Sequence, residues 1–326
     1  MDETGTNCCD PGILCHMGSR PSRSPENDRA RRYAVSGQPF DAPRLPAGLT
    51  IVATPIGNLR DITLRALEMM AGADLVACED TRVTRKLFDH YGLSTPLMSY
   101  HEHNAEAARP KILEKIAAGN AVALVSDAGT PLISDPGYKL VREALEEGLQ
   151  VTSVPGASAA LAALTSAGLP TDTFLFAGFL PPKGGQRRKR LEELKPVPAT
   201  LIFYETSSRL AAALADMAVV FGAREAAVAK ELTKLHESVA RGTPAELAAT
   251  LETSIELKGE FVVLVGPPAA GEAEIGDDAI VARLKQALEQ ESFRDAVRSV
   301  AEDFKVKRSR VYDLGLALER RDRGAP

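Results

Sequence analysis

Short apolar runs alternate with stretches of helical hydrophobic spacing between residues 48 and 167. The apolar runs are typical of buried strands and cover residues 49–53, 73–78, 97–100, a stretch that ends at 126, and 151–154. Each run is followed by a helical pattern, at residues 61–71, 83–91, 106–118, 138–147 and 159–167. Strands that alternate with helices of this length form parallel sheets, so the pattern predicts an α/β fold.

The segment Gly168-Leu169-Pro170 interrupts this pattern and predicts a boundary between an N-terminal α/β domain, residues 48–168, and a smaller α/β domain, residues 169–268. In the second domain the expected strands cover residues 174–179, 200–204, 225–231 and 259–266. A linker of Ala, Gly and acidic residues, 269–278, follows. Three further helical patterns predict a small helix-turn-helix-like domain, residues 279–326, with helices at 279–290, 293–304 and 309–320.

Residues 1–47 are expected to be a disordered leader, because they are rich in Arg, Ser, Pro, Asp and Gly and lack apolar periodicity. Its arginines are candidates for an arm that touches RNA; the alternatives are a solvated tail and a start codon set upstream of the true one. Three of the four cysteines lie in this segment, so no disulfide framework is expected. This cysteine usage fits a reducing, cytoplasmic location.

Charge and hydropathy restrict the function classes. The net charge of −5 argues against a general nucleic-acid coat, so any RNA contact must come from local basic patches. No apolar run reaches the roughly 18–20 residues that cross a bilayer, and the start of the chain lacks the apolar core of a signal peptide. A membrane partner is therefore not expected.

The stretch ALVSDAGTPLISDPG, residues 123–137, is the strongest single candidate for a binding site. A buried strand stops there in a loop of Gly, Pro, acidic and hydroxylated residues, and a helical pattern begins at once. Open α/β sheets bind ligands at the carboxyl ends of their strands, where glycine lets the backbone approach the ligand. A plain strand-to-helix turn is the alternative interpretation.

Several common motifs are absent. No G-x-G-x-x-G follows the first strand, and neither G-x-x-x-x-G-K-[ST] nor H-E-x-x-H occurs. His101 and His103 are two residues apart with no third ligand in sequence reach, so no metal site is predicted.

Seven segments together carry a family resemblance. They are ATPIGNLRDIT (53–63), CEDTRVTRKL (78–87), SYHEHN (99–104), SDAGTPLISDPG (126–137), VPGASA (154–159), FYETSSR (203–209) and KELTKLHE (230–237). In this order they resemble the tetrapyrrole (corrin/porphyrin) methylase superfamily. The specific resemblance is to its ribosomal RNA branch, which methylates the 2′-oxygen of a cytidine ribose in the 16S rRNA of the small ribosomal subunit.

The resemblance implies a homodimer of two-domain α/β chains that bind S-adenosylmethionine (AdoMet) in the cleft between the domains. It places the AdoMet contacts at Pro55, Asp127, Ala128, Gly129, Thr130, Pro131, Ile133, Ser134, Ser158, Ala159, Phe179, Tyr204 and Leu232. The branch's own motifs, CEDTR and SYHEHN, are expected to face the RNA. The candidates for RNA binding are Arg60, Arg82, Arg85, Arg209, Lys307, Arg308 and Arg310.

Methyl transfer to a ribose hydroxyl is an in-line displacement that is helped by removal of a weakly acidic proton. Asp80, Lys86 and His101 are the catalytic candidates, with Glu102 and Glu205 as further possible bases; the sequence does not choose among them. In the alternative interpretation Asp80 and Arg82 only pair with each other. Two other functions stay open at this point: methylation of a tetrapyrrole or precorrin-like small molecule, and an idle AdoMet- or RNA-binding module.

Overall fold

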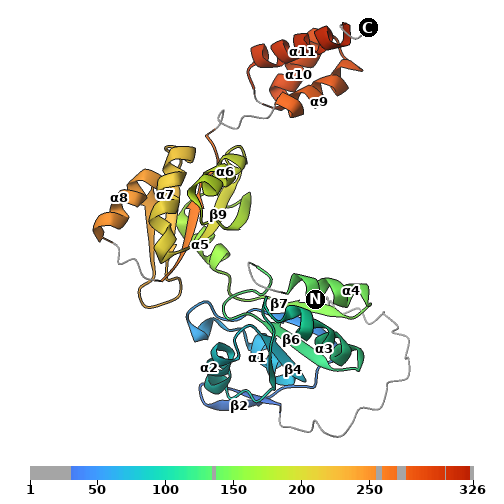
Figure 1. Ribbon diagram of the computed structural model, residues 1–326, viewed down its shortest axis with the longest axis vertical. Helices are drawn as coiled ribbons and strands as arrows, with labels where there is room; N and C mark the ends of the chain where they lie inside the picture. The colour runs from blue at the N-terminus through green and yellow to red at the C-terminus, as the bar shows by residue number, and fades with distance from the viewer. Residues whose placement is uncertain (1–30, 134–136, 255–258, 270–276, 305, 324–326) are drawn as a thin grey trace, which may run out of the picture.

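The computed structural model describes residues 31–133, 137–254, 259–269, 277–304 and 306–323. Along the chain these residues form an N-terminal sheet with its helices, a C-terminal sheet with its helices, and a group of three helices (Figure 1).

The N-terminal sheet is fully parallel, as predicted. Its strand order is β5-β4-β6-β3-β7, formed by β3 (Gly48–Val52), β4 (Leu75–Cys78), β5 (Leu97–Ser99), β6 (Ala121–Val125) and β7 (Val151–Val154). Helices α1 (Leu64–Gly72) and α2 (Thr81–Tyr91) pack on one face, and α3 (Ala105–Ala117) and α4 (Tyr138–Glu146) pack on the other. Burial on both faces explains why the central strands read as unbroken apolar runs.

The C-terminal sheet has the order β11-β10-β12-β9-β8, with β8 (Phe174–Phe179), β9 (Thr200–Thr206), β10 (Ala226–Lys230), β11 (Ser238–Gly242) and β12 (Glu260–Val265). Only β8 and β9 pair in parallel; the other three pairs are antiparallel. One face carries α6 (Gly184–Leu194), α7 (Ser207–Phe221) and α8 (Pro244–Ser254). Strand β11 was not predicted from the sequence.

Helix α5 (Ala159–Ala167) packs on the second sheet, not on the first. Its buried residues, among them Ala163 and Leu164, share an apolar cluster with Ile202, Ala229 and Leu264. The Arg241 Nε donates to the carbonyl of Ala167 at 2.9 Å and holds the end of the helix against β11. The packing therefore puts the change from one sheet to the other before Ala159, about ten residues earlier than the boundary expected at Gly168.

The prediction of a disordered leader is wrong for the residues just before β3. Strands β1 (Arg32–Val35) and β2 (Gln38–Asp41) form an antiparallel hairpin whose turn residues, Ser36 and Gly37, have φ angles of 52° and 81°. Positive φ at both positions is the geometry of a tight hairpin turn, and the Ser-Gly pair was its sequence signal. The chain then buries Ala42 and Leu45 against α1. Residues 1–30 of the expected leader lie outside the described residues.

Helices α9 (Asp277–Leu288), α10 (Phe293–Asp303) and α11 (Arg308–Arg323) pack on one another, as the three C-terminal patterns predicted (Figure 1). Their core includes Ile280, Leu284, Val300 and Val311. Across the described ranges, no helix is both long and apolar enough to cross a membrane.

Candidate active site

All five strands of the parallel sheet end in register at one edge. Cys78 at the end of β4 pairs with Ser99 of β5 and with Val125 of β6, and Val52 of β3 pairs with Val125 and with Val154 of β7. The polar residues that follow these strands, 79–82, 101–104 and 127–130, therefore share that edge, as the sequence predicted.

Asp127 and Asp80 meet at this edge. The Asp127 Oδ1 accepts the backbone N–H of Asp80 at 3.0 Å. Burial raises the pKa of Asp127, and the neighbouring Asp80 carboxylate adds to that rise. Asp80 itself caps α2 and pairs with Arg82 at 2.6 Å, and these hydrogen bonds lower the pKa of Asp80 to about 2. The pairing of Asp80 with Arg82 is the one that the alternative interpretation expected.

A cavity of about 320 Å³ lies where this edge faces the C-terminal sheet. That volume falls in the range of small-molecule sites. Residues from both halves of the chain line it: Ile56, Asp127, Ala128, Gly129, Thr130, Ile133, Ser158, Ala159, Phe179, Tyr204, Glu205, Thr206, Ala229, Leu232, Lys234, Glu260, Phe261 and Val262.

The loop after β6 is fixed by hydrogen bonds at its base. Thr54 and Gly129 exchange both backbone hydrogen bonds, at 2.9 and 3.1 Å, and the Thr130 hydroxyl donates to the Ala157 carbonyl. Gly129 has a φ of 77°, and a Cβ there would lie 3.2 Å from Ile56 Cγ2. Only glycine takes this conformation at no cost, and its small size brings the backbone close to the cavity.

An aromatic wall closes the side formed by the C-terminal sheet. Tyr204 contacts Phe176 and Phe179 edge-on, with ring centroids 4.8 and 5.7 Å apart. Phe179 is half exposed and lines the cavity with Tyr204, so a flat apolar surface faces the cavity. Such a wall suits an aromatic ring of a ligand.

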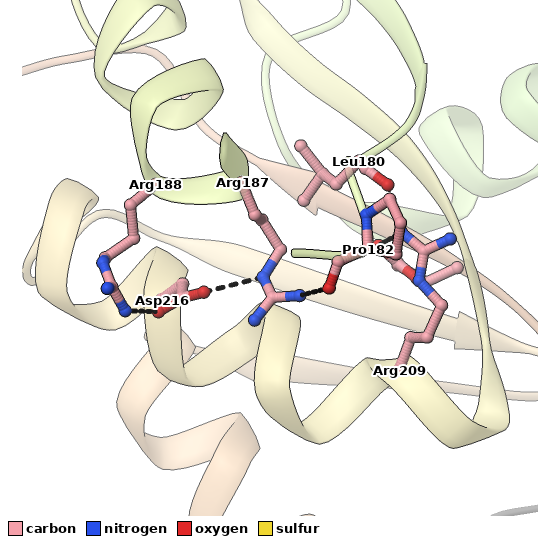
Figure 2. Close-up of polar contacts among 7 residues, drawn as sticks. Leu180, Pro182, Arg187, Arg188, Arg209 and Asp216 are labelled. Carbon is pink, nitrogen blue, oxygen red and sulfur yellow. Dashed lines mark hydrogen bonds and ion pairs between the residues drawn. The ribbon is translucent and has the colours of Figure 1, made fainter. Parts of the chain in front are cut away.

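Glu205 is a carboxylate at the foot of this wall. Its side chain is fully buried, and burial raises the pKa of Glu205 although the nearby Arg209 works in the opposite direction. The Arg209 Nε lies 3.4 Å from the Glu205 carboxylate, and another nitrogen of the guanidinium donates to the Leu180 carbonyl. Arg209, expected to bind RNA phosphate, thus holds the loop after β8 (Figure 2).

The same loop is held a second time by Arg187. Its guanidinium lies between Asp216 and the Pro182 carbonyl (Figure 2) and donates to them at 2.7 and 3.1 Å. Asp216 also accepts from Arg188 at 3.0 Å. Because Phe179 directly precedes this loop, these contacts fix one wall of the cavity.

Of the residues expected to bind the cofactor, ten line the cavity: Asp127, Ala128, Gly129, Thr130, Ile133, Ser158, Ala159, Phe179, Tyr204 and Leu232. Pro55 and Pro131 are buried in the flanking turns and are not among its lining residues. Ser134 lies outside the described residues.

Among the described residues that line the cavity, none is one of the three catalytic candidates, Asp80, Lys86 and His101. Lys86 is exposed on α2, and the buried Nδ1 of His101 has no hydrogen-bond partner among the described residues. Asp80 and His101 belong to the sheet edge beside the cavity, whereas Lys86 lies further along α2.

The remaining candidates for RNA binding are at the surface or in surface ion pairs. Arg60, Arg85 and Lys307 are exposed. Arg308 pairs with Glu302 at 2.9 Å, and Arg310 pairs with Asp277 at 2.7 Å.

Sequence reasoning missed several lining residues from the C-terminal sheet and its loops, among them Ala229, Lys234, Glu260 and Val262. Ala229 and Val262 meet because β10 pairs with β12 in antiparallel register. The ammonium of Lys234 lies 3.0 Å from both Glu231 and Glu260. Burial alone would lower the pKa of Lys234, but these two carboxylates raise it.

The described residues contain no cluster of three or more His, Cys, Asp or Glu side chains that could hold a metal ion. The polar groups around the cavity are backbone groups, hydroxyls, carboxylates and the Lys234 ammonium, set between apolar walls. This arrangement suits an organic ligand with polar ends.

Comparison with known proteins identifies the family. The family description "Tetrapyrrole (Corrin/Porphyrin) Methylases" matches residues 48–248. A protein of Mesorhizobium japonicum named ribosomal RNA small subunit methyltransferase I is 55% identical over 248 residues, which cover 76% of this chain and 83% of that protein. The chain belongs to the tetrapyrrole methylase family, in the branch of these ribosomal RNA methyltransferases.

Two further relatives carry the same name. The protein of Halalkalibacterium halodurans is 43% identical over 273 residues, covering 82% of this chain and 93% of its own. The protein of Escherichia coli O157:H7 is 44% identical over 271 residues, covering 82% and 94%.

Solved structures of more distant proteins share the fold. The methyltransferase CobJ superposes with a TM-score of 0.51 at 20% identity, covering 69% of this chain and 95% of that one. Diphthine synthase gives a TM-score of 0.51 at 16% identity, covering 67% and 89%. At these identities the likeness concerns the fold alone.

Proposed function

We propose that this protein transfers the methyl group of AdoMet to the 2′-hydroxyl of a cytidine ribose in the 16S rRNA of the small ribosomal subunit. The observation that carries the proposal is the relationship to ribosomal RNA small subunit methyltransferases I at 43–55% identity over 83–94% of their length. The cavity supports it, because it lies at the carboxyl ends of parallel strands in a methylase fold.

The residues of the cavity fit AdoMet. Backbone groups at 127–130 and the Thr206 hydroxyl suit its amino-acid part, and the wall of Phe179, Tyr204 and Leu232 suits its adenine. The carboxylates of Asp127 and Glu205 suit the positive charge of its sulfonium. When bound, AdoMet supplies a methyl group activated by that sulfonium.

The chain's own task is to align the ribose hydroxyl and to accept its proton. We propose that the RNA lies over the sheet edge that carries Asp80 and His101 and over the adjoining part of α2 with Lys86, and that Arg60, Arg82 and Arg85 hold its phosphates. With a pKa of about 2, Asp80 is a weak proton acceptor; Asp80, Lys86 and His101 all remain the catalytic candidates to be compared by mutation. We further propose that the protein acts in the cytoplasm as a homodimer. Each chain would consist of an N-terminal α/β unit, residues 48–158, a C-terminal α/β unit, residues 159–268, and a C-terminal helical domain.

The test is transfer of labelled methyl from AdoMet to small ribosomal subunits from cells that lack this modification. Free 16S rRNA and a tetrapyrrole mixture are run in parallel, and the modified nucleotide is identified by mass spectrometry. We expect a single 2′-O-methylcytidine in the 16S rRNA of the subunit. Label that appears only in the tetrapyrrole fraction would overturn the substrate while leaving the AdoMet site intact. Light scattering at several concentrations checks the dimer.

A further inference from the structure

A second hollow lies on the C-terminal helices, between α10 and α11. Its volume is about 440 Å³, and its lining residues are Phe293, Arg294, Val297, Arg298, Arg308 and Tyr312. Three of these six residues are arginines and two are aromatic. This composition differs from the apolar cavity between the sheets and points to a different ligand.

The two aromatic rings form one corner of the hollow. The centroids of Phe293 and Tyr312 are 5.6 Å apart, and the rings are inclined at 75°. The Phe293 ring rests directly on α11, because a Cβ on Gly315 would lie 2.7 Å from its Cε2 atom. Tyr312 is 47% exposed, so its ring offers an open face at the surface.

The charges around the rings favour an anion. Arg298 pairs with Asp295 and Arg308 pairs with Glu302, both at 2.9 Å. No ion pair or hydrogen bond joins the exposed Arg294 side chain to another described residue. Three arginines against two carboxylates leave one positive charge uncompensated at the hollow.

We propose that this hollow binds one unpaired nucleotide of the RNA substrate, with its base stacked on Tyr312 and its phosphate at Arg294. The proposal rests on the proposed function, which supplies the RNA. Aromatic rings beside arginines are how proteins hold single-stranded nucleic acid, because every base has a face that stacks and every nucleotide has a phosphate. The nucleotide must be unpaired, since the face of a base is hidden inside a duplex.

The experiment uses the full-length protein and a short fluorescein-labelled oligouridylate, with binding followed by fluorescence anisotropy over a range of salt concentrations. Tyr312→Ala weakens binding about tenfold at each salt concentration, because it removes stacking and no charge. Arg294→Gln reduces the slope of log affinity against log salt by about 0.7, the value for one lost phosphate contact on a single strand. Tyr312→Phe keeps the wild-type affinity.

The matched control is Lys285→Gln, which removes one exposed positive charge of the same helices outside the hollow. It is expected to leave both the affinity and the slope near wild type. The proposal is overturned if wild-type protein does not bind the oligouridylate, or if Arg294→Gln and Tyr312→Ala behave like this control. Loss of binding in Tyr312→Phe, or an equal effect of Tyr312→Ala on a blunt RNA duplex, also overturns it.

Methyl transfer to small ribosomal subunits, measured on the same proteins, separates the two proposals. If the proposed function is wrong, wild-type protein transfers no methyl group to the 16S rRNA. If only the hollow is misassigned, wild-type protein methylates the subunit and the Tyr312→Ala variant does so with the same KM. A KM for the subunit raised several-fold in Tyr312→Ala, with an unchanged KM for AdoMet, supports both.

Discussion

The side chain of Lys234 lies against the α-carbon of Gly57. A Cβ on Gly57 would come within 2.5 Å of Lys234 Cγ and 3.1 Å of the Leu232 carbonyl oxygen. Nearby, the Asn58 N–H donates to the Thr233 hydroxyl at 3.2 Å. The turn after β3 thus fits against the loop after β10, and both Leu232 and Lys234 line the cavity. The shape of the cavity depends on this close approach between the two halves of the chain.

Gly57→Ala is therefore expected to move the 232–234 loop. Inserting one methyl group into a tight contact typically costs about 1–3 kcal/mol. We expect a lower urea midpoint of unfolding and a several-fold weaker affinity for AdoMet, measured by isothermal titration calorimetry. Gly185→Ala is the control, because a Cβ there meets nothing within 4 Å. Wild-type affinity in Gly57→Ala would show that the loop does not shape the site.

The β1–β2 hairpin provides a second prediction. Arg31 pairs with Asp74 at 2.8 Å, and the two side chains are 9% and 4% exposed. Breaking a buried ion pair by removing one partner costs about 3–5 kcal/mol, so Arg31→Met should destabilise the protein strongly. The adjacent Arg32 pairs with Asp41 at the surface, where such pairs contribute about 0–1 kcal/mol. Urea unfolding should show a large loss for Arg31→Met and a small one for Arg32→Met; equal losses would contradict the burial argument.

The N-terminal sheet was predictable because its strands are buried on both faces. Runs such as Leu75–Cys78 and Ala121–Val125 are fully buried, and the polar residues that follow them mark the carboxyl edge. The loop at 127–130 was predictable for the same reason. Local pattern thus identified one half of the cavity.

The other half depends on strand pairing, which local pattern does not encode. The antiparallel register that places Ala229 beside Val262 joins segments more than thirty residues apart. Strand β11, Ser238–Gly242, is short and partly exposed, so it lacks an apolar run. The β1–β2 hairpin is polar enough to look disordered, and its order comes from the tertiary contacts of Arg31, Ala42 and Leu45.

The ion-pair cluster of Figure 2 gives a third prediction. Arg187 and Asp216 are paired with side chains only 8% and 10% exposed. In Asp216→Ala the Arg187 charge stays buried without its carboxylate, so we expect a loss of about 3–5 kcal/mol. Glu193→Ala is the control, because the Arg190–Glu193 pair is about half exposed. Denaturant unfolding should separate the two variants; a loss below about 1 kcal/mol in Asp216→Ala would contradict the account.

The last prediction concerns the pH dependence that Glu205 confers. Burial raises the pKa of Glu205 in the folded protein above its value in the unfolded chain. The folded state therefore binds the proton more readily, so this group stabilises the protein at pH values below both pKa values and loses that contribution as pH rises through the folded pKa. Glu205→Gln carries no such titration. We expect the stability of the wild type relative to Glu205→Gln to fall as pH rises from the acidic range to neutrality.

The measurement is the urea midpoint of unfolding of both proteins at a series of pH values, with the exposed Glu193→Gln as the control. For the control, the difference from wild type should change little with pH. If the wild type instead gains stability relative to Glu205→Gln as pH rises, the attraction of Arg209 outweighs burial. Glu205 would then be a partner of Arg209 with a lowered pKa, which would contradict the dominance of burial.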